Sequence, residues 1–359
     1  MIRVLIPCMP SADDVLPYLR RIDRARMYSN GGPLLHDLNG RLTSLLQQPA
    51  RAVSTGTAAL ELSLRSLRLP SGSPVLLPSV TFIASGLAAL NAGLRPVIMD
   101  VHPRTWQLDP ETAAAQWFSL GFNVGAIMPV AAFGMPVDID AWRCVAEETG
   151  AQVVIDAAGA LVEQAPSSAP QTLTCYSLHA TKFIGAGEGG VVCTVNEGRL
   201  KAVEAMSRFG DGGTNAKLSE YHAAVALASM EPDAVQHKHA RTKLVADRYT
   251  EGLRRVPGIA VQRDPSALST MLVVKLPRGS DALLVADAMA HRGVETKRWY
   301  SPFLHDHPAL ASYCAGAVPV ASALAQRLLG LPFHPFMSAL DVTTVCGALH
   351  EVLALTTAV

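Results

Sequence analysis

The chain has 359 residues, enough for two domains or for one large domain with a smaller companion. Its 30 Lys and Arg balance its 30 Asp and Glu, and the formal net charge of +0 gives no electrostatic reason to expect nucleic acid or an anionic membrane as a partner. Hydrophobic residues make up 49% and charged residues 17%, which excludes an intrinsically disordered chain and indicates a compact soluble protein.

Membrane insertion, secretion and metal binding are not expected either. The longest apolar segment, residues 83–99, contains Asn91, Arg95 and Pro96, so it does not predict a membrane span. The first ten residues hold only a short, interrupted apolar run, so we expect no signal peptide and a cytoplasmic protein. The six cysteines are far apart and form no CxxC pair, which favours buried free thiols over a metal site or a redox dithiol.

Short, almost continuous apolar runs recur between residues 52 and 200, and segments with a helical pattern separate them. Such runs predict strands covered on both faces, as in a layered α/β sheet. The expected strands are Pro74–Pro78, Arg95–Asp100, Val124–Val130, Gln152–Asp156 and Thr172–Leu178.

Two helices between these strands have recognisable ends. Asp109 followed by Pro110 is typical of an N-cap with proline at the first helical position. Asp138 and Asp140 precede a second helix, which Gly150 is expected to end.

The pattern changes after about residue 233. Residues 235–256 read as one long helix, and they are followed by an expected strand over 270–276 and expected helices over 281–292 and 340–355. We therefore predict a large α/β domain over residues 1–234, which includes an N-terminal helical segment, and a small C-terminal domain over residues 235–359.

Lys182 has the most informative surroundings. It lies in residues 177–190 (SLHATKFIGAGEGG), where a strand leads into a turn and then into a glycine-rich loop. A lysine in a partly desolvated site holds its proton less tightly and can act as a nucleophile or form a Schiff base. The alternative is an ordinary surface lysine before a glycine turn.

Asp156 ends the apolar strand of VVIDAA, at the edge where open α/β sheets bind ligands. The two alanines that follow leave room for a planar group. A helix cap is the alternative role for this side chain.

Two further segments supply weaker signals. Gly56 and Thr57 begin a helix, whose free N–H groups and positive dipole end could bind a phosphate, although capping alone explains many such starts. Phe82 follows a strand end, where it could lie flat against a heterocycle, although a core phenylalanine is the more common explanation. Together, the four signals match what pyridoxal 5′-phosphate (PLP) requires: a phosphate site, a ring support, a carboxylate for the pyridine nitrogen and a Schiff-base lysine.

The sequence resembles the DegT/StrS family of sugar-nucleotide aminotransferases, which have PLP fold type I, over most of its length. The motifs that carry the resemblance are residues 54–60, 78–84, 96–100, 129–138 (PVAAFGMPVD), 177–190, 213–227 (GTNAKLSEYHAAVAL) and 298–308 (RWYSPFLHDHP). The resemblance implies an α/β fold with a mostly parallel mixed sheet covered by helices, and a smaller C-terminal α+β domain.

Carried over by position, the resemblance implies roles for individual residues. Lys182 would form the internal Schiff base, Asp156 would pair with the pyridine nitrogen, and Phe82 would stack on the ring. The phosphate would be held by Gly56, Thr57 and Ser177.

Asn215 would reach the same phosphate from a neighbouring subunit, so the resemblance implies a homodimer with shared active sites. His179, Tyr300 and His305 are the expected substrate-binding residues. His179 could instead support the lysine turn, and we take Glu188 as structural.

One position departs from the family pattern. The family usually has Gln or His after its Asp-Ala-Ala, where it contacts the phenolic oxygen of PLP, and this chain has Gly159. Lys182 is retained, which argues against the relatives that carry histidine there and act as dehydratases.

We therefore expect a PLP-dependent aminotransferase that moves an amino group from an amino acid, L-glutamate, to a nucleotide-linked keto sugar. One alternative is another PLP reaction, such as sugar dehydration. The other is a non-catalytic PLP-binding regulatory protein, against which the lack of a basic DNA-binding extension argues.

Overall fold

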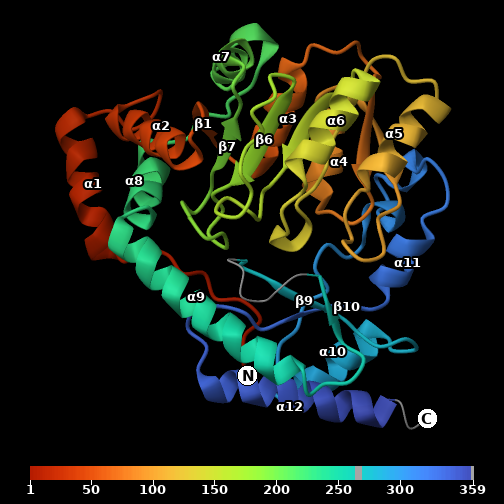
Figure 1. Ribbon diagram of the computed structural model, residues 1–359. Coiled ribbons are helices and arrows are strands. Elements are labelled where there is room, and N and C mark those ends of the chain that lie inside the picture. The colour runs from red at the N-terminus through yellow and green to blue at the C-terminus, as the bar shows by residue number, and fades with distance from the viewer. Residues whose placement is uncertain (263–268, 357–359) are drawn as a thin grey trace.

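The computed structural model describes residues 1–262 and 269–356 and contains two sheets (Figure 1). The larger sheet has the strand order β1-β7-β6-β5-β4-β2-β3. Its strands are β1 (Ala50–Val53), β2 (Pro74–Pro78), β3 (Arg95–Met99), β4 (Ala126–Ile127), β5 (Gln152–Asp156), β6 (Thr172–Ser177) and β7 (Gly190–Cys193). Strands β2 to β6 run parallel, whereas β7 is antiparallel to both β6 and β1. The predicted α/β class with a mostly parallel mixed sheet is confirmed.

Successive side chains of the strands point into two separate hydrophobic cores, as the pleat of a sheet requires. In β5, Val153 and Ile155 belong to one core and Val154 to the other. The first core is closed by α1 (Ala12–Ala25), α2 (Pro33–Leu46), α5 (Pro110–Ser119), α6 (Ile139–Thr149) and α8 (Glu220–Ser229). The second is closed by α3 (Gly56–Ser66), α4 (Ile83–Asn91) and α7 (Glu197–Met206). Burial on both faces explains the continuous apolar runs of the sequence.

Helix ends follow the local signals of the sequence. The Asp109 carboxylate accepts the Thr112 N–H at 2.9 Å, and Pro110 is the first residue of α5. The Asp138 carboxylate accepts the Ala141 N–H at 3.0 Å, and Gly150 ends α6 with a φ of +70°, which favours glycine. Both predicted helices are confirmed.

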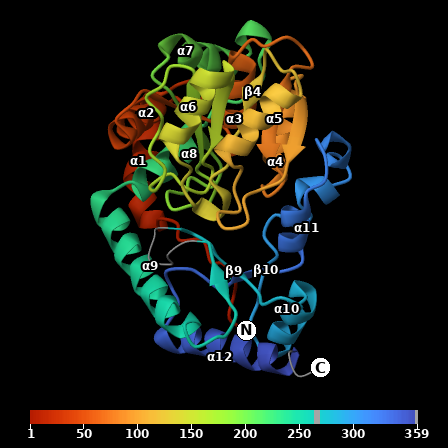
Figure 2. The same cartoon turned by 45° about the vertical axis from the view of Figure 1, so that its right-hand side comes forward.

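The smaller sheet lies below the larger one in Figures 1 and 2, among the last helices. Its order is β10-β9-β8, with β8 (Ala260–Val261), β9 (Leu272–Lys275) and β10 (Leu328–Leu331). The helices here are α9 (Pro232–Leu253), α10 (Ala282–His291), α11 (Pro319–Ala325) and α12 (Ala339–Thr356). Short 3-10 turns are Ala132–Gly134, Gly210–Gly212, Leu304–Asp306 and Ala311–Tyr313. Helices α9, α10 and α12 share a third hydrophobic core with β9 and β10.

Most element boundaries differ from the expectation by one or two residues, and two differ by more. The long helix begins at Pro232 rather than 235, because proline at the first position starts it, and it ends at Leu253. The strand expected over 124–130 is only Ala126–Ile127. The domain boundary predicted at residue 234 falls inside α9, and the chain start pairs with residues near the small sheet through the bridge of Ile2 to Val294. The division into two domains stays a prediction.

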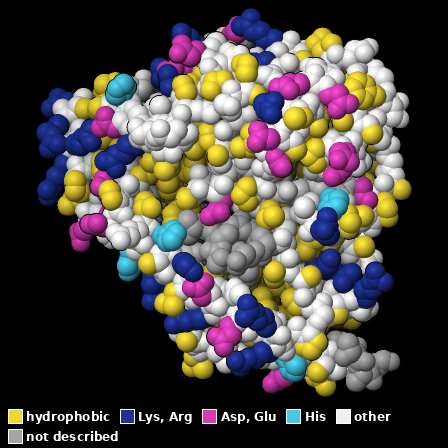
Figure 3. All heavy atoms as spheres, in the orientation of Figure 1, with side chains coloured by type: hydrophobic (Ala, Val, Ile, Leu, Met, Phe, Trp, Pro, Cys, Tyr) yellow, Lys and Arg dark blue, Asp and Glu magenta, His cyan; other side chains and the backbone are white. Residues whose placement is uncertain are grey.

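The outer surface matches the balanced composition. Figure 3 shows acidic and basic side chains interspersed over one face, with a group of Lys and Arg side chains at its left edge, the side on which Figure 1 shows α1. Among the described helices, none is long and apolar enough to cross a membrane.

Candidate active site

A cavity of about 850 Å³ opens where β2, β5 and β6 end at their carboxyl ends. This is the edge at which open α/β sheets bind ligands. The opposite wall comes from residues 297–302 and from Thr270 and Met271 beside β9. The predicted residues that line it are Gly56, Thr57, Phe82, Asp156, Ser177, His179, Lys182 and Tyr300.

Asp156 is the last residue of β5 and is only 5% exposed. Its Oδ2 accepts a hydrogen bond from the Ser85 hydroxyl at 2.7 Å, and its Oδ1 accepts the Ala158 N–H at 3.1 Å. The Thr81 and Ser85 hydroxyls lie 2.7 Å apart and continue the network. Burial raises the pKa of the Asp156 carboxyl, and these hydrogen bonds and the Lys182 cation oppose the rise. The two hydrogen bonds therefore hold the carboxylate in one orientation at the edge of the cavity that it lines.

Lys182 lies in the turn that follows β6, where its N–H donates to the His179 carbonyl at 2.8 Å. Burial lowers the pKa of the Lys182 amine, and the attraction of Asp156 opposes this. A lysine that loses its proton more readily is a better nucleophile. Lys182 and Asp156 therefore line the same cavity, and burial favours the neutral form of the Lys182 amine.

The start of α3 forms the third part of the site. Its first intrahelical bond runs from the Ala59 N–H to the Thr55 carbonyl at 3.0 Å, and the Thr55 hydroxyl accepts the Ala58 N–H at 3.0 Å. The N–H groups of Gly56 and Thr57 precede these bonds, so they are available to an anion. A Cβ at Gly56 would lie 3.0 Å from the Ser177 Cβ, so glycine lets the helix start approach the end of β6.

The aromatic side chains of the cavity are arranged in a series. Phe82 is 58% exposed, so it is not the core phenylalanine of the alternative interpretation. Its ring centroid lies 6.4 Å from that of Tyr300, which stacks on Phe133 at 4.7 Å with an interplanar angle of 12°. The Tyr300 hydroxyl accepts the Phe133 N–H at 3.3 Å, and burial raises the pKa of the phenol. The Phe82 ring therefore has a free face that a flat group can cover.

His179 and Glu188 form a polar corner of the cavity. His179 Nε2 lies 3.8 Å from Glu188 Oε1, and its Nδ1 lies 2.8 Å from the Thr181 hydroxyl. About half of each of the two side chains is exposed. Gly159 also lines the cavity, and a Cβ there would meet its nearest neighbour, the Gly134 nitrogen, at an ordinary 3.5 Å.

Two predicted residues do not lie with the others. His305 is turned away from the cavity: its Nδ1 lies 2.5 Å from the Ser79 hydroxyl and its Nε2 3.3 Å from that of Ser322. These contacts connect the end of β2 to α11, and the substrate-binding role of His305 stays a prediction. Asn215 does not line the cavity of its own chain, and its backbone forms a bridge with Arg208 after α7.

Several residues of the site were not predicted from the sequence. Ser85 is buried beneath the cavity and does not line it, but its hydroxyl donates to Asp156, a contact that only the fold brings about. Lys297, Arg298 and His307 line the cavity. Arg298 and His307 belong to the motif over residues 298–308 and Lys297 directly precedes it, and no local pattern distinguishes which of these side chains face inward.

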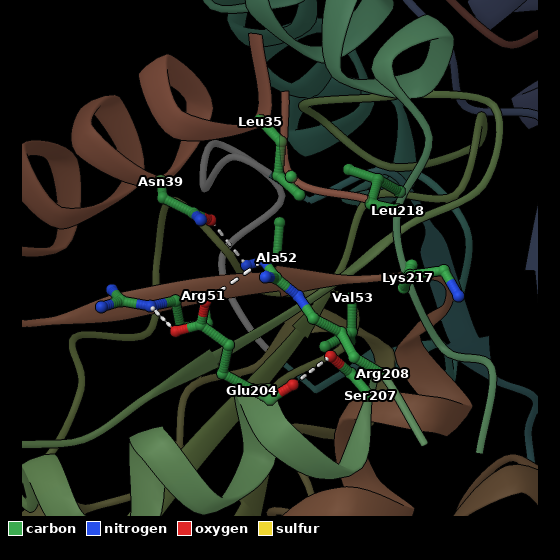
Figure 4. A pocket seen from close by; sticks show the side chains of 11 residues that line it. Leu35, Asn39, Arg51, Ala52, Val53, Glu204, Ser207, Arg208, Lys217 and Leu218 are labelled. Atoms are coloured by element: carbon green, nitrogen blue, oxygen red, sulfur yellow. Dashed lines mark hydrogen bonds and ion pairs between the residues drawn. The ribbon is translucent and has the colours of Figure 1, made fainter. Parts of the chain in front are cut away.

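A second, much smaller cavity lies beside β1 and α7 (Figure 4). Arg51 and Arg208 both contact Glu204, at 3.0 and 3.2 Å, and Asn39 accepts the Ala52 N–H at 2.8 Å. Its free volume of about 10 Å³ holds roughly one water molecule, so it cannot hold a cofactor. In the described part of the chain, no group of three or more His, Cys, Asp and Glu is placed to bind a metal ion.

One cavity at the sheet edge is thus lined by a lysine whose pKa is lowered, a buried carboxylate and the start of a helix. The chain belongs to the DegT/DnrJ/EryC1/StrS aminotransferase family, whose model matches residues 11–350. The predicted family and the predicted class of enzyme are confirmed.

Three individual proteins of known name or structure are similar to this chain over most of its length. The chain is 27% identical over 334 residues to UDP-2-acetamido-2-deoxy-3-oxo-D-glucuronate aminotransferase of Pseudomonas aeruginosa, covering 89% of this chain and 90% of that protein. It is similar to the crystal structure of DesI with its TDP-sugar product, with a TM-score of 0.89 and 30% identity over 99% and 95% of the two chains. DesV of S. venezuelae, solved with a ketimine intermediate, has a TM-score of 0.84 and 26% identity over 94% of each chain.

Proposed function

We propose that this protein is a PLP-dependent aminotransferase that transfers an amino group from L-glutamate to a nucleotide-linked keto sugar. The observation that carries the proposal is the meeting of Lys182, Asp156 and the start of α3 in one cavity of about 850 Å³. A volume of this size suits a cofactor together with a substrate. The sugar-nucleotide part is supported by the relatives, which act on a UDP-linked sugar and bind a TDP-linked sugar.

The residues present fit PLP. The N–H groups of Gly56 and Thr57, with the Ser177 hydroxyl nearby, suit its phosphate, and the Phe82 face suits its ring. Asp156 is a buried carboxylate that suits the pyridine nitrogen, and Lys182 supplies the amine for a covalent link. Bound PLP supplies an electron sink for the electrons of the bond broken at the amino acid's α-carbon.

The side chains of the cavity have separate tasks in this reaction. Lys182 holds the cofactor through Nζ and, once the donor has displaced it, accepts at Nζ the proton that leaves the donor's α-carbon. Its lowered pKa favours the neutral amine that this step needs. Asp156 would keep a proton on the pyridine nitrogen of bound PLP, and the Ser85 hydroxyl and Ala158 N–H hold the carboxylate in place for this.

The polar corner of the cavity suits the sugar. His179 and Glu188 are both half-exposed, and Tyr300 lines the same cavity. Together these side chains offer hydrogen-bond donors and acceptors to sugar hydroxyls. Asn215 lies outside the cavity of its own chain, which favours the predicted contribution from the partner subunit of a homodimer.

The half-reaction with the donor tests this function. Adding L-glutamate to the PLP-loaded protein should remove the absorbance of bound PLP and release 2-oxoglutarate, and the correct nucleotide-linked keto sugar should restore the absorbance. Lys182→Ala should show neither change and should no longer be labelled covalently by PLP and borohydride. Covalent labelling of that variant, or no response to any amino-acid donor, would contradict the proposal.

A further inference from the structure

The turn that carries Lys182 is held by a second lysine, in the second turn of α9. Lys238 Nζ lies 2.6 Å from the Phe183 carbonyl oxygen, 3.0 Å from that of Cys8 and 3.3 Å from that of Lys182. An ammonium group has three N–H donors, so these three bonds use its complete donor set. Nζ also lies 5.2 Å from the centroid of the Phe183 ring, within cation–π range.

These contacts explain why an ammonium occupies this position. Lys238 is partly buried, and a lysine in such a place needs hydrogen-bond acceptors because desolvation of its charge is costly. In the described part of the chain, the partners of Lys238 are backbone carbonyls, and none is a carboxylate. A methionine would cover the same apolar surface without the desolvation cost, but it could not donate to the three carbonyl oxygens. The hydrogen bonds to these carbonyls are therefore what lysine adds at this position.

The same turn is fixed at other points. The Ser229 hydroxyl, at the end of α8, donates to the Gly185 carbonyl at 2.6 Å. Phe183 and Ile184 are 6% and 2% exposed and belong to the first hydrophobic core. Because the Lys182 carbonyl is bonded to its own Cα, holding that carbonyl restricts the direction in which the Lys182 side chain leaves the backbone.

We propose that Lys238 is a positioning residue, which holds the backbone of the Lys182 turn and the N-terminal segment together so that Lys182 points at the cofactor. This inference rests on the proposed function of Lys182. Lys238 acts through the backbone of the turn and not by contact with substrate or cofactor.

The test compares Lys238→Met with Lys243→Met, a matched control on the same helix. The control lysine is 52% exposed and pairs with Asp247. In the cofactor-free protein, amide hydrogen exchange of residues 179–187 should be at least tenfold faster in Lys238→Met and unchanged in the control. In the PLP-loaded protein, the pH midpoint of the absorbance of bound PLP should shift in Lys238→Met only, and PLP affinity should fall at least tenfold.

Two outcomes separate this inference from a structural role and from the proposed function. A Lys238→Met protein that is less stable but keeps wild-type exchange at residues 179–187 and the wild-type absorbance titration overturns the inference. If this variant does not fold, Lys238→Gln, whose amide keeps two N–H donors, is measured in the same way against the same criteria. Covalent labelling of Lys182→Ala overturns the proposed function instead, whatever the Lys238 variants do.

Discussion

Glu220 is a buried carboxylate whose removal should destabilise the fold strongly. It is 0% exposed, and its two oxygens accept the N–H groups of Leu34 and Leu35, at 2.8 and 2.9 Å. It is also the first residue of α8. The carboxylate therefore lies at the positive ends of two helices, α2 and α8, and this stabilises its charge without a buried cation.

The expected loss follows from the two N–H groups. Glu220→Ala leaves both without an acceptor in a region closed to solvent, at about 1 to 3 kcal/mol each. The free energy of unfolding should therefore fall by about 2 to 6 kcal/mol. A water molecule that entered the space left by the side chain would bring the loss to the lower end of this range.

Urea unfolding of the cofactor-free protein measures this loss. Trp117 and Trp142 lie in the same hydrophobic core as α2, so their fluorescence reports its unfolding. Glu220→Gln should lose less than Glu220→Ala, because it keeps one acceptor oxygen. Glu251→Ala is the control: its side chain is 74% exposed and pairs with Arg255, so it should lose at most about 0.5 kcal/mol. A Glu220→Ala protein as stable as this control would refute the reasoning.

Three further changes test the site. Ser85→Ala removes a hydrogen bond that lowers the pKa of Asp156, so that pKa should rise further and the acid limb of the kcat/KM profile should move to higher pH; an unchanged limb would exclude this role. Phe82→Ala should weaken PLP binding by about 0.5 to 1.5 kcal/mol, measured by dialysis, without altering thermal stability; unchanged affinity would remove the ring from the site. Lys182→Ala subunits mixed with Asn215→Ala subunits should regain activity in hybrids, provided that Asn215→Ala is impaired alone; activity equal to the sum of the parents would mean that each site lies within one chain.

The fold was predictable where the signal is local. The strands Pro74–Pro78 and Gln152–Asp156 have the predicted bounds. A strand covered on both faces is a continuous apolar run, so it can be recognised from its own residues without knowing which strands pair with it. By contrast, β1 and β7 have only four residues each (ARAV and GVVC) and were not predicted. They become strands by pairing with each other and, for β7, with β6, and this pairing joins residues about 140 apart.

The candidate site was likewise predictable only where the signal is local. Asp156 ends β5 and Lys182 lies in the turn after the adjacent parallel strand β6, so the sheet rule that placed each at a carboxyl end also predicts that they lie at the same edge. The direction of the His305 ring depends on Ser79 and on Ser322 of α11, which no pattern in residues 298–308 contains. Ser85 was missed for a related reason, since its importance comes from its contact with Asp156.

The motif over residues 177–190 predicts the lysine of the turn but not the groups that hold the backbone of that turn. Residues 177–190 predict a reactive lysine after a strand, but the backbone that directs it is held by groups outside the motif. Its carbonyls accept bonds from Ser229 and Lys238, and Lys238 also holds the carbonyl of Cys8 at the chain start. If Lys238 has the positioning role proposed above, a substitution in α8 or α9 changes the reactivity of Lys182 while every residue of the motif is intact. Chains that share the motif should accordingly differ in activity according to the residues that support its turn.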